Sequence, residues 1–280
     1  MNIKIMSDTA CDLSDELIAE LGVTLVPFTI VKAGESFMDR VTITPKDIFA
    51  HVAAGGDLCS TTAINAGEYT DWFEKYAKDY DGIIMISIGS GFSCTYQNAC
   101  IAAEDFDNVR VVDSMNLSTG QGLVVLKACE LAKTCDNLDT LQQELQEYAK
   151  RVEASFLLDQ LKYMVKGGRC SGAAALGANL LNLKPCIEVR DGKMSVVKKY
   201  RGNYAKCLAS YVKDRLSGRD DLDKGTLFVT YTPVTDECMD AVKTAVAQYN
   251  IFEKTYWCDA GSTISCHCGP GTLGILFVRK

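Results

Sequence analysis

The sequence contains no apolar run of about 18 residues, the length that a membrane-spanning helix needs. It also has no long run of lysine or arginine, and its formal net charge is −7. A nucleic-acid partner, whose phosphates require a concentrated basic surface, is therefore not expected. The first segment, Met1–Asp8, is a short apolar strand that meets a charge too early for a signal peptide. We expect a cytoplasmic protein without stable membrane insertion.

Several motifs of nucleotide and metal sites are also missing. The phosphate-loop motif G-x-x-x-x-G-K-[ST] is absent, and no G-x-G-x-x-G follows the first predicted strand. No C-x-x-C pair occurs, so Cys266-His267-Cys268 lacks the usual spacing of a zinc site. The thirteen cysteines are odd in number and scattered through apolar stretches without an export signal, so most should be small buried residues. We expect neither a metal nor a cofactor.

What the chain does have is globular composition, with 48% hydrophobic and 23% charged residues over 280 positions, enough for two domains. Short apolar runs alternate with amphipathic stretches through about the first 160 residues, which is typical of a parallel sheet with crossover helices. The strands predicted here are Ile3–Met6, Val23–Ile30, Gly82–Ile88 and Val109–Val112. The helices are Ser14–Leu21, one that begins at Thr44-Pro45, and Leu138–Glu153.

The pattern changes after Glu153, and we place a domain junction near residue 160. Pro185–Val189 and Met194–Tyr200 flank an Asp-Gly pair, which is a strong hairpin signal. The remaining elements are predicted as strand Ala154–Leu158, helix Tyr204–Leu216, strand Thr226–Tyr231, helix Asp236–Tyr249, strand Phe252–Trp257 and a last strand near Gly274–Val278. The prediction is therefore an α/β fold with an N-terminal parallel-sheet α/β domain at 1–160 and an α+β domain at 161–280.

Hydroxyl-rich segments fall where predicted strands lead into helices, the usual position of ligand sites in open α/β sheets. In Ser7–Leu13, the aspartates Asp8 and Asp12 are best interpreted as helix caps. Ser60-Thr61-Thr62 and Gly89–Tyr96 offer hydroxyls and free backbone N–H groups, which favour a carboxylate or a phosphate. The alternative interpretation makes Ser93 or Thr95 an N-cap and nothing more.

Two further segments carry ionisable side chains. Arg169, after Gly167-Gly168, can bind an anion or brace the two domains, and His267, before Cys268-Gly269-Pro270-Gly271, can be a site residue or a structural histidine. Ser93 and His267 also allow a serine hydrolase or acyl transferase. The stretch around Ser93 lacks the second glycine of G-x-S-x-G, so that match is incomplete.

Taken together, five segments resemble the DegV family in order and approximate spacing. They are Ser7-Asp8-Thr9, Thr61-Thr62, Ser90–Gln97, Gly167-Gly168-Arg169 and His267–Gly271. The resemblance implies a lipid carrier rather than an enzyme, with a long-chain fatty acid held between the two domains. It places the carboxylate contacts on Thr61, Thr62 and Ser93, with Arg169 and His267 nearby.

The resemblance also implies a partner. Some members of the family hand the acid to a dihydroxyacetone kinase-like fatty acid kinase for acyl phosphate formation, and a basic residue at the position of Arg201 contacts that kinase. Two departures stand out. The chain reads Thr61-Thr62-Ala63-Ile64-Asn65 where relatives usually have Thr-Ser-Gln-Pro-Ser, and Cys94 replaces the usual glycine after Ser93. The carrier is the first hypothesis. A serine hydrolase or acyl transferase is the second, and a metal-binding regulator using Cys266, His267 and Cys268 is the third.

Overall fold

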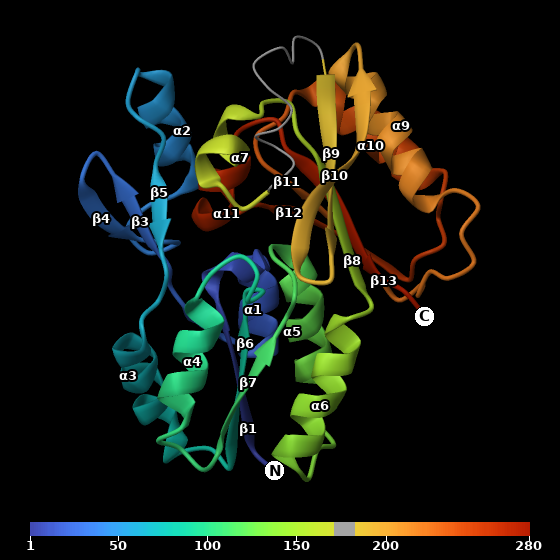
Figure 1. The fold of residues 1–280 in the computed structure, drawn as a ribbon. Coiled ribbons are helices and arrows are strands. Elements are labelled where there is room, and N and C mark those ends of the chain that lie inside the picture. The colour runs from blue at the N-terminus through green and yellow to red at the C-terminus, as the bar shows by residue number, and fades with distance from the viewer. Residues whose placement is uncertain (171–182) are drawn as a thin grey trace.

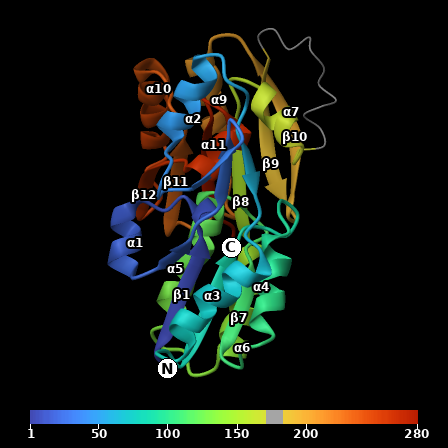
Figure 2. The ribbon, with the colours of Figure 1, turned by 90° about the vertical axis from the view of Figure 1, so that its left-hand side faces the viewer.

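The structure is a computed structural model that describes residues 1–170 and 183–280. Two main sheets lie end to end, one built from the first part of the chain and one from the second, and a small third sheet lies beside them (Figures 1 and 2). Among the helices in the described residues, none is long and apolar enough to cross a membrane.

The first sheet is parallel, with the strand order β2-β1-β6-β7. Its strands are β1 (Ile3–Asp8), β2 (Thr24–Val26), β6 (Gly82–Ser87) and β7 (Val109–Asp113). Every residue of β6 is buried because helices cover both faces. Figure 1 shows α3 (Ala66–Ala77) and α4 (Thr95–Ala103) on one side and α5 (Thr119–Leu131) and α6 (Leu138–Ala149) on the other. A further helix, α1 (Asp15–Leu21), lies between β1 and β2 in the chain and has Ser14 as its N-cap.

The small sheet has the order β4-β3-β5 and is antiparallel. It consists of β3 (Thr29–Lys32), β4 (Glu35–Met38) and β5 (Ser60–Thr62), with α2 (Pro45–Ala53) between β4 and β5 in the chain. As predicted, α2 begins at Thr44-Pro45. The predicted single strand Val23–Ile30 is wrong. Pro27 has no N–H for a ladder, and the chain divides there into β2 and β3, which belong to different sheets.

The second sheet is mixed, with the order β10-β9-β8-β13-β11-β12. Only β11 and β12 pair in parallel, and the other neighbours are antiparallel. Its strands are β8 (Val152–Leu157), β9 (Leu183–Arg190), β10 (Lys193–Arg201), β11 (Thr226–Tyr231), β12 (Lys254–Asp259) and β13 (Leu273–Val278). Its helices are α7 (Lys162–Gly167), α9 (Tyr204–Leu216), α10 (Asp236–Ala247) and α11 (Ser262–Cys268). The α/β fold with a parallel N-terminal sheet and a mixed C-terminal sheet is thus confirmed.

The Asp-Gly hairpin is also confirmed. Asp191 has φ 50° and Gly192 has φ 69°, so both central residues of the turn adopt the left-handed conformation that a two-residue hairpin favours. Helix α9 and strand β11 have the predicted bounds.

Other predicted bounds need correction. The predicted helix Leu138–Glu153 ends at Ala149, because the next residues form β8 and pair with β9 and β13. Strand β8 consequently begins two residues before the predicted strand Ala154–Leu158, while β12 begins two residues after the predicted start at Phe252. Helix α10 ends at Ala247 instead of Tyr249. The domain division at 160 stays a prediction; β8, which precedes it, already belongs to the second sheet.

Candidate functional site

The carboxyl edge of the parallel sheet holds the candidate site. The strand order reverses between β1 and β6, and ligands of open α/β sheets bind in the crevice outside such a point. Asp8, at the end of β1, organises this edge. Its carboxylate accepts hydrogen bonds from the backbone N–H of Ile88 (2.7 Å) and of Ala10 (3.1 Å) and from the Gln121 amide (2.9 Å). Asp8 is fully buried, and burial raises its pKa to about 6. The predicted capping role of Asp8 is confirmed at the short 3-10 helix Thr9–Cys11, whereas the same role predicted for Asp12 is wrong, because Ser14 caps the next helix, α1. The bond from Ile88 to Asp8 also fixes the start of the loop that follows β6.

A pocket with an empty volume of about 660 Å³ opens at this edge. Its walls come from both parts of the chain. The large apolar residues that line it are Phe28, Ile88, Phe92, Leu117, Met164, Met194 and Ile264. Its polar lining residues are Thr61, Ser93, Arg169, Thr263 and His267. We call this cavity the head-group pocket. No carboxylate lines it among the described residues, and Arg169 is the one charged side chain there, so its electrostatics favour an anion.

Thr61 and His267 meet inside the head-group pocket, although 206 positions separate them in the sequence. The Thr61 hydroxyl oxygen lies 2.8 Å from Nε2 of His267. Burial, and to a lesser extent the charge of Arg169, lowers the pKa of His267 to about 4, so the ring is neutral at pH 7.

The neutral ring of His267 carries one proton, and its surroundings decide which nitrogen holds it. Nδ1 is buried without a hydrogen-bond partner among the described residues. A buried ring N–H that lacks an acceptor is less common than a buried unprotonated ring nitrogen that lacks a donor. We therefore place the proton on Nε2, which donates to Thr61. The Thr61 hydroxyl then keeps its own proton for a ligand in the pocket.

Gly167 allows the ring of His267 to lie where it does. A Cβ atom at Gly167 would be 2.5 Å from Nδ1 of His267, so any larger residue would displace the imidazole. Arg169 follows two residues later and is exposed. Its guanidinium donates to the Gly167 carbonyl (2.6 Å) and, at 3.4 Å, to the Phe92 carbonyl. The Gly167-Gly168-Arg169 segment therefore both makes room for the imidazole and supplies the cation.

Ser93 lies just before α4, whose N-terminus faces this loop. Its hydroxyl accepts from the Thr95 backbone N–H (3.2 Å) and lies 2.8 Å from the Thr95 hydroxyl. The interpretation of Ser93 or Thr95 as the N-cap is wrong, because Cys94 is the N-cap of α4 and makes no side-chain capping hydrogen bond. Ser93 lies one residue before it and lines the head-group pocket. The Ser93 hydroxyl can accept from the Thr95 N–H with a lone pair and donate its own proton to an anion.

Thr62 and Arg201 lie outside the head-group pocket. Thr62 is exposed, because alternate residues of strand β5 point to opposite faces and Thr61 faces the pocket. Arg201 is exposed at the end of β10. The structure therefore brings Thr61, Ser93, Arg169 and His267 together and leaves the other two predicted residues apart.

A second, mainly apolar cavity of about 350 Å³ adjoins the head-group pocket. The two cavities share Leu117, Ile264 and Cys268 as lining residues. The second cavity continues between α5 and the β8, β11 and β13 strands, where Phe156, Tyr231 and Leu276 line it. A polar group bound in the head-group pocket would therefore lie beside a mainly apolar cavity.

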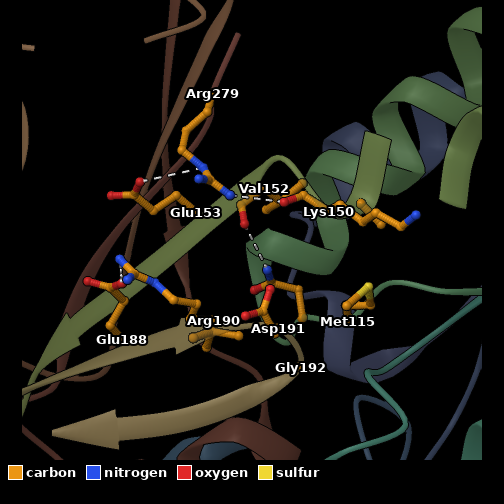
Figure 3. Close-up of a pocket in the computed structure, with 12 residues that line it drawn as sticks. Met115, Lys150, Val152, Glu153, Glu188, Arg190, Asp191, Gly192 and Arg279 are labelled. Atoms are coloured by element: carbon orange, nitrogen blue, oxygen red, sulfur yellow. Dashed lines mark hydrogen bonds and ion pairs between the residues drawn. The ribbon is translucent and has the colours of Figure 1, made fainter. Parts of the chain in front are cut away.

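A third pocket lies where the hairpin tip meets the first part of the chain (Figure 3). Three cations, Lys150, Arg190 and Arg279, and three anions, Glu153, Glu188 and Asp191, line it. The two glutamates are nearly buried and are ion-paired with arginines, including Glu188 with Arg190 at 2.7 Å. Because the charges balance, this pocket offers no net attraction to an anion and is best described as an ionic junction.

The hairpin tip is also held against the head-group loop. A Cβ atom at Gly91 would lie 2.1 Å from the carbonyl oxygen of Gly192, so the two backbones are in close contact there. Met194, just beyond the tip, lines the head-group pocket. The hairpin of the second sheet therefore forms part of the wall of a site whose polar groups come mostly from other elements.

The arrangement for a serine hydrolase is not assembled among the described residues. Nε2 of His267 faces Thr61 instead of Ser93, and no carboxylate accepts a proton from Nδ1. In the same part of the chain, no three His, Cys, Asp or Glu side chains are grouped as metal ligands. Ten of the thirteen cysteines are buried, as the sequence predicts.

Sequence reasoning missed several residues that build the site. Asp39 hydrogen-bonds to Thr263 and had no motif to mark it. Phe28, Met164 and Met194 are apolar residues whose convergence depends on the tertiary fold. For Thr263, the run Gly261-Ser262-Thr263 before a short helix was the available signal.

Comparisons with known proteins agree with this architecture. The family described as "Uncharacterised protein, DegV family" matches residues 2–280. A DegV domain-containing protein of Clostridium acetobutylicum is 29% identical over 99% of each chain. Solved structures of a DegV family protein from Thermus thermophilus (27% identity, TM-score 0.89) and of DegV from Bacillus subtilis (26%, 0.83), both covering 100% of each chain, are described as fatty acid binding. The chain belongs to the DegV family.

Proposed function

We propose that this protein binds a long-chain fatty acid and presents its carboxylate to a separate kinase, which forms the acyl phosphate. One observation carries the proposal: a pocket with hydroxyls, a neutral imidazole and a single cation adjoins an apolar cavity. The fatty acid binding that is described for the relatives from T. thermophilus and B. subtilis supports the same ligand class.

In this proposal, the carboxylate contacts Thr61 and Ser93, with Arg169 and His267 nearby. A buried carboxylate is costly unless it is hydrogen-bonded or paired, and the Thr61 and Ser93 hydroxyls meet that need. Thr62 is exposed, so its predicted role as a ligand contact is the weakest part of the predicted site.

The tail supplies the affinity. Burying about 15 methylenes at ~0.8 kcal/mol each gives ~12 kcal/mol before the costs of association and ordering. The apolar residues around both cavities are where those methylenes would be buried. The head group then decides orientation and chemical selectivity.

Presentation to a kinase requires that the head group can be reached from outside. Arg169 is exposed and Ser93 is partly exposed, so the polar end of the head-group pocket is the accessible end. Arg201 lies in the most basic short run of this acidic chain, Lys198-Lys199-Tyr200-Arg201, and we assign it to the kinase interface. Charged residues at the edge of an interface mainly control association rate and salt dependence.

The binding part of the proposal is tested by displacement of a fluorescent fatty acid with a C16 fatty acid and with the C16 alcohol. The two competitors share a tail and differ in the head group, so the acid should compete at least 10-fold better. Equal competition would contradict a carboxylate site. A chromogenic ester tests the second hypothesis, because turnover that depends on Ser93 and His267 would identify a hydrolase.

A further inference from the structure

Helix α11 is short, but it forms much of the head-group pocket. Its seven residues include Thr263, Ile264, His267 and Cys268, all of which line the pocket. A helix of two turns has little stability of its own, so its position depends on tertiary contacts. The contacts at its first turn therefore determine where His267 lies.

Asp39 holds the first turn of α11. One carboxylate oxygen accepts from the Ser262 backbone N–H (3.1 Å). The other accepts from the Thr263 backbone N–H (3.2 Å) and from the Thr263 hydroxyl (2.6 Å). Asp39 is fully buried, so these three hydrogen bonds take the place of water around its carboxylate.

Asp12 holds the residue just before α11. Its Oδ1 accepts from the Gly261 backbone N–H (2.8 Å), and its Oδ2 accepts from the Ser118 hydroxyl (2.6 Å). A Cβ atom at Gly261 would lie 2.9 Å from Oδ1 of Asp12 and 3.9 Å from Oδ2 of Asp39, so the two carboxylates flank this glycine. Three successive N–H groups at the start of α11 are thus held by two buried carboxylates from the first 40 residues of the chain.

We infer that Asp39 and Asp12 are positioning residues of the head-group pocket, which fix the first turn of α11 so that His267 reaches Thr61. The inference rests on the proposed function in one respect, namely that the pocket holds a carboxylate. Neither aspartate lines the pocket, so each acts through the helix that it holds.

The test uses two readouts of Asp39→Asn, a substitution that keeps the shape of the side chain and removes its charge. The first is the NMR titration of the His267 ring; the chain has two histidines, so a His267→Gln spectrum assigns the signals. The second is affinity for a C16 fatty acid. Glu68→Gln is the matched control, because Glu68 accepts from the Asn65 backbone N–H (2.8 Å) at the start of α3 and does not line the pocket.

In the wild type, the His267 ring should remain neutral, with its proton on Nε2, until the pH is close to 4. In Asp39→Asn, the His267 ring should become more solvated and titrate nearer the ordinary histidine range. The affinity for the C16 fatty acid should fall at least 10-fold. Glu68→Gln should change neither readout.

A folded Asp39→Asn protein with an unchanged ring titration would overturn the inference, whether or not its affinity falls. If Asp39→Asn does not fold, Asp12→Ala takes its place with the same two readouts, since alanine removes the acceptor of the Gly261 backbone N–H. If the wild type binds no fatty acid, the proposed function fails, while the ring titration still decides whether the two aspartates position His267.

Discussion

Thr61 and Thr62 provide a matched pair of substitutions at the centre of the proposed site. They are neighbours on β5, yet Thr61 lines the head-group pocket and contacts His267, while Thr62 is exposed on the opposite face. Valine has nearly the shape of threonine and a high preference for strands, so either substitution should preserve β5. Only the hydroxyl is removed.

Thr61→Val should weaken fatty acid binding substantially. A hydrogen bond to a charged group contributes roughly 1.5–3 kcal/mol, which corresponds to roughly a 10- to 150-fold increase in Kd. The substitution also leaves Nε2 of His267 without its partner at 2.8 Å, so the upper part of this range is the more reasonable expectation. Thr62→Val should bind as the wild type does.

Displacement of a fluorescent fatty acid measures both values, and thermal unfolding shows whether the variants are equally stable. If Thr61→Val kept the wild-type Kd, the hydroxyl of Thr61 would not hold the carboxylate. If Thr62→Val lost affinity instead, Thr62 would be the contact and the orientation of β5 assumed above would be wrong.

Four further predictions concern other parts of the protein. Arg169→Ala should retain the free acid but lose kinase-coupled acyl phosphate formation, measured by mass spectrometry, because the product carries more negative charge. Arg201→Ala should keep its ligand and lose coupling most clearly at low salt, whereas Lys193→Ala, at the other end of β10, should couple normally. Burial raises the pKa of Asp12 to about 7, so the folded chain binds a proton at Asp12 more tightly than the unfolded chain does. The free energy of unfolding should therefore rise as the pH falls from 8 to 6.5. Chemical denaturation of Asp12→Asn should show a weaker dependence on pH over this range. Gly91→Ala should lower the free energy of unfolding by about 1–3 kcal/mol in the same assay, because its Cβ would meet the Gly192 carbonyl.

The sequence predicted those parts of the fold that a few neighbouring residues determine. Asp191-Gly192 forms the expected hairpin because both residues tolerate a positive φ, and Thr44-Pro45 begins α2 as a cap and a first turn should. The boundary between α6 and β8 could not be predicted in this way. Residues after Ala149 continue a helical pattern, but their pairing with β13 outweighs that preference.

The candidate site shows the same division. The sequence identified the segments that contain Thr61, Ser93, Arg169 and His267 because hydroxyls and glycines at strand ends are a local signal. It did not reveal that Ser60–Thr62 is a strand, since three hydroxyl residues carry no apolar alternation, and so it did not separate Thr61 from Thr62. The contact between Asp39 and α11 joins residues more than 220 positions apart in the sequence, so it depends on how the small sheet and the second sheet pack together.

The claim that this protein carries a fatty acid is tested most directly by native mass spectrometry of the purified chain. The account predicts a mass above that of the polypeptide by the mass of one long-chain fatty acid, which is released intact on denaturation and is depleted in Thr61→Val but not in Thr62→Val. A polypeptide that carries no acid, and that takes none up when a C16 acid is added, would contradict the account.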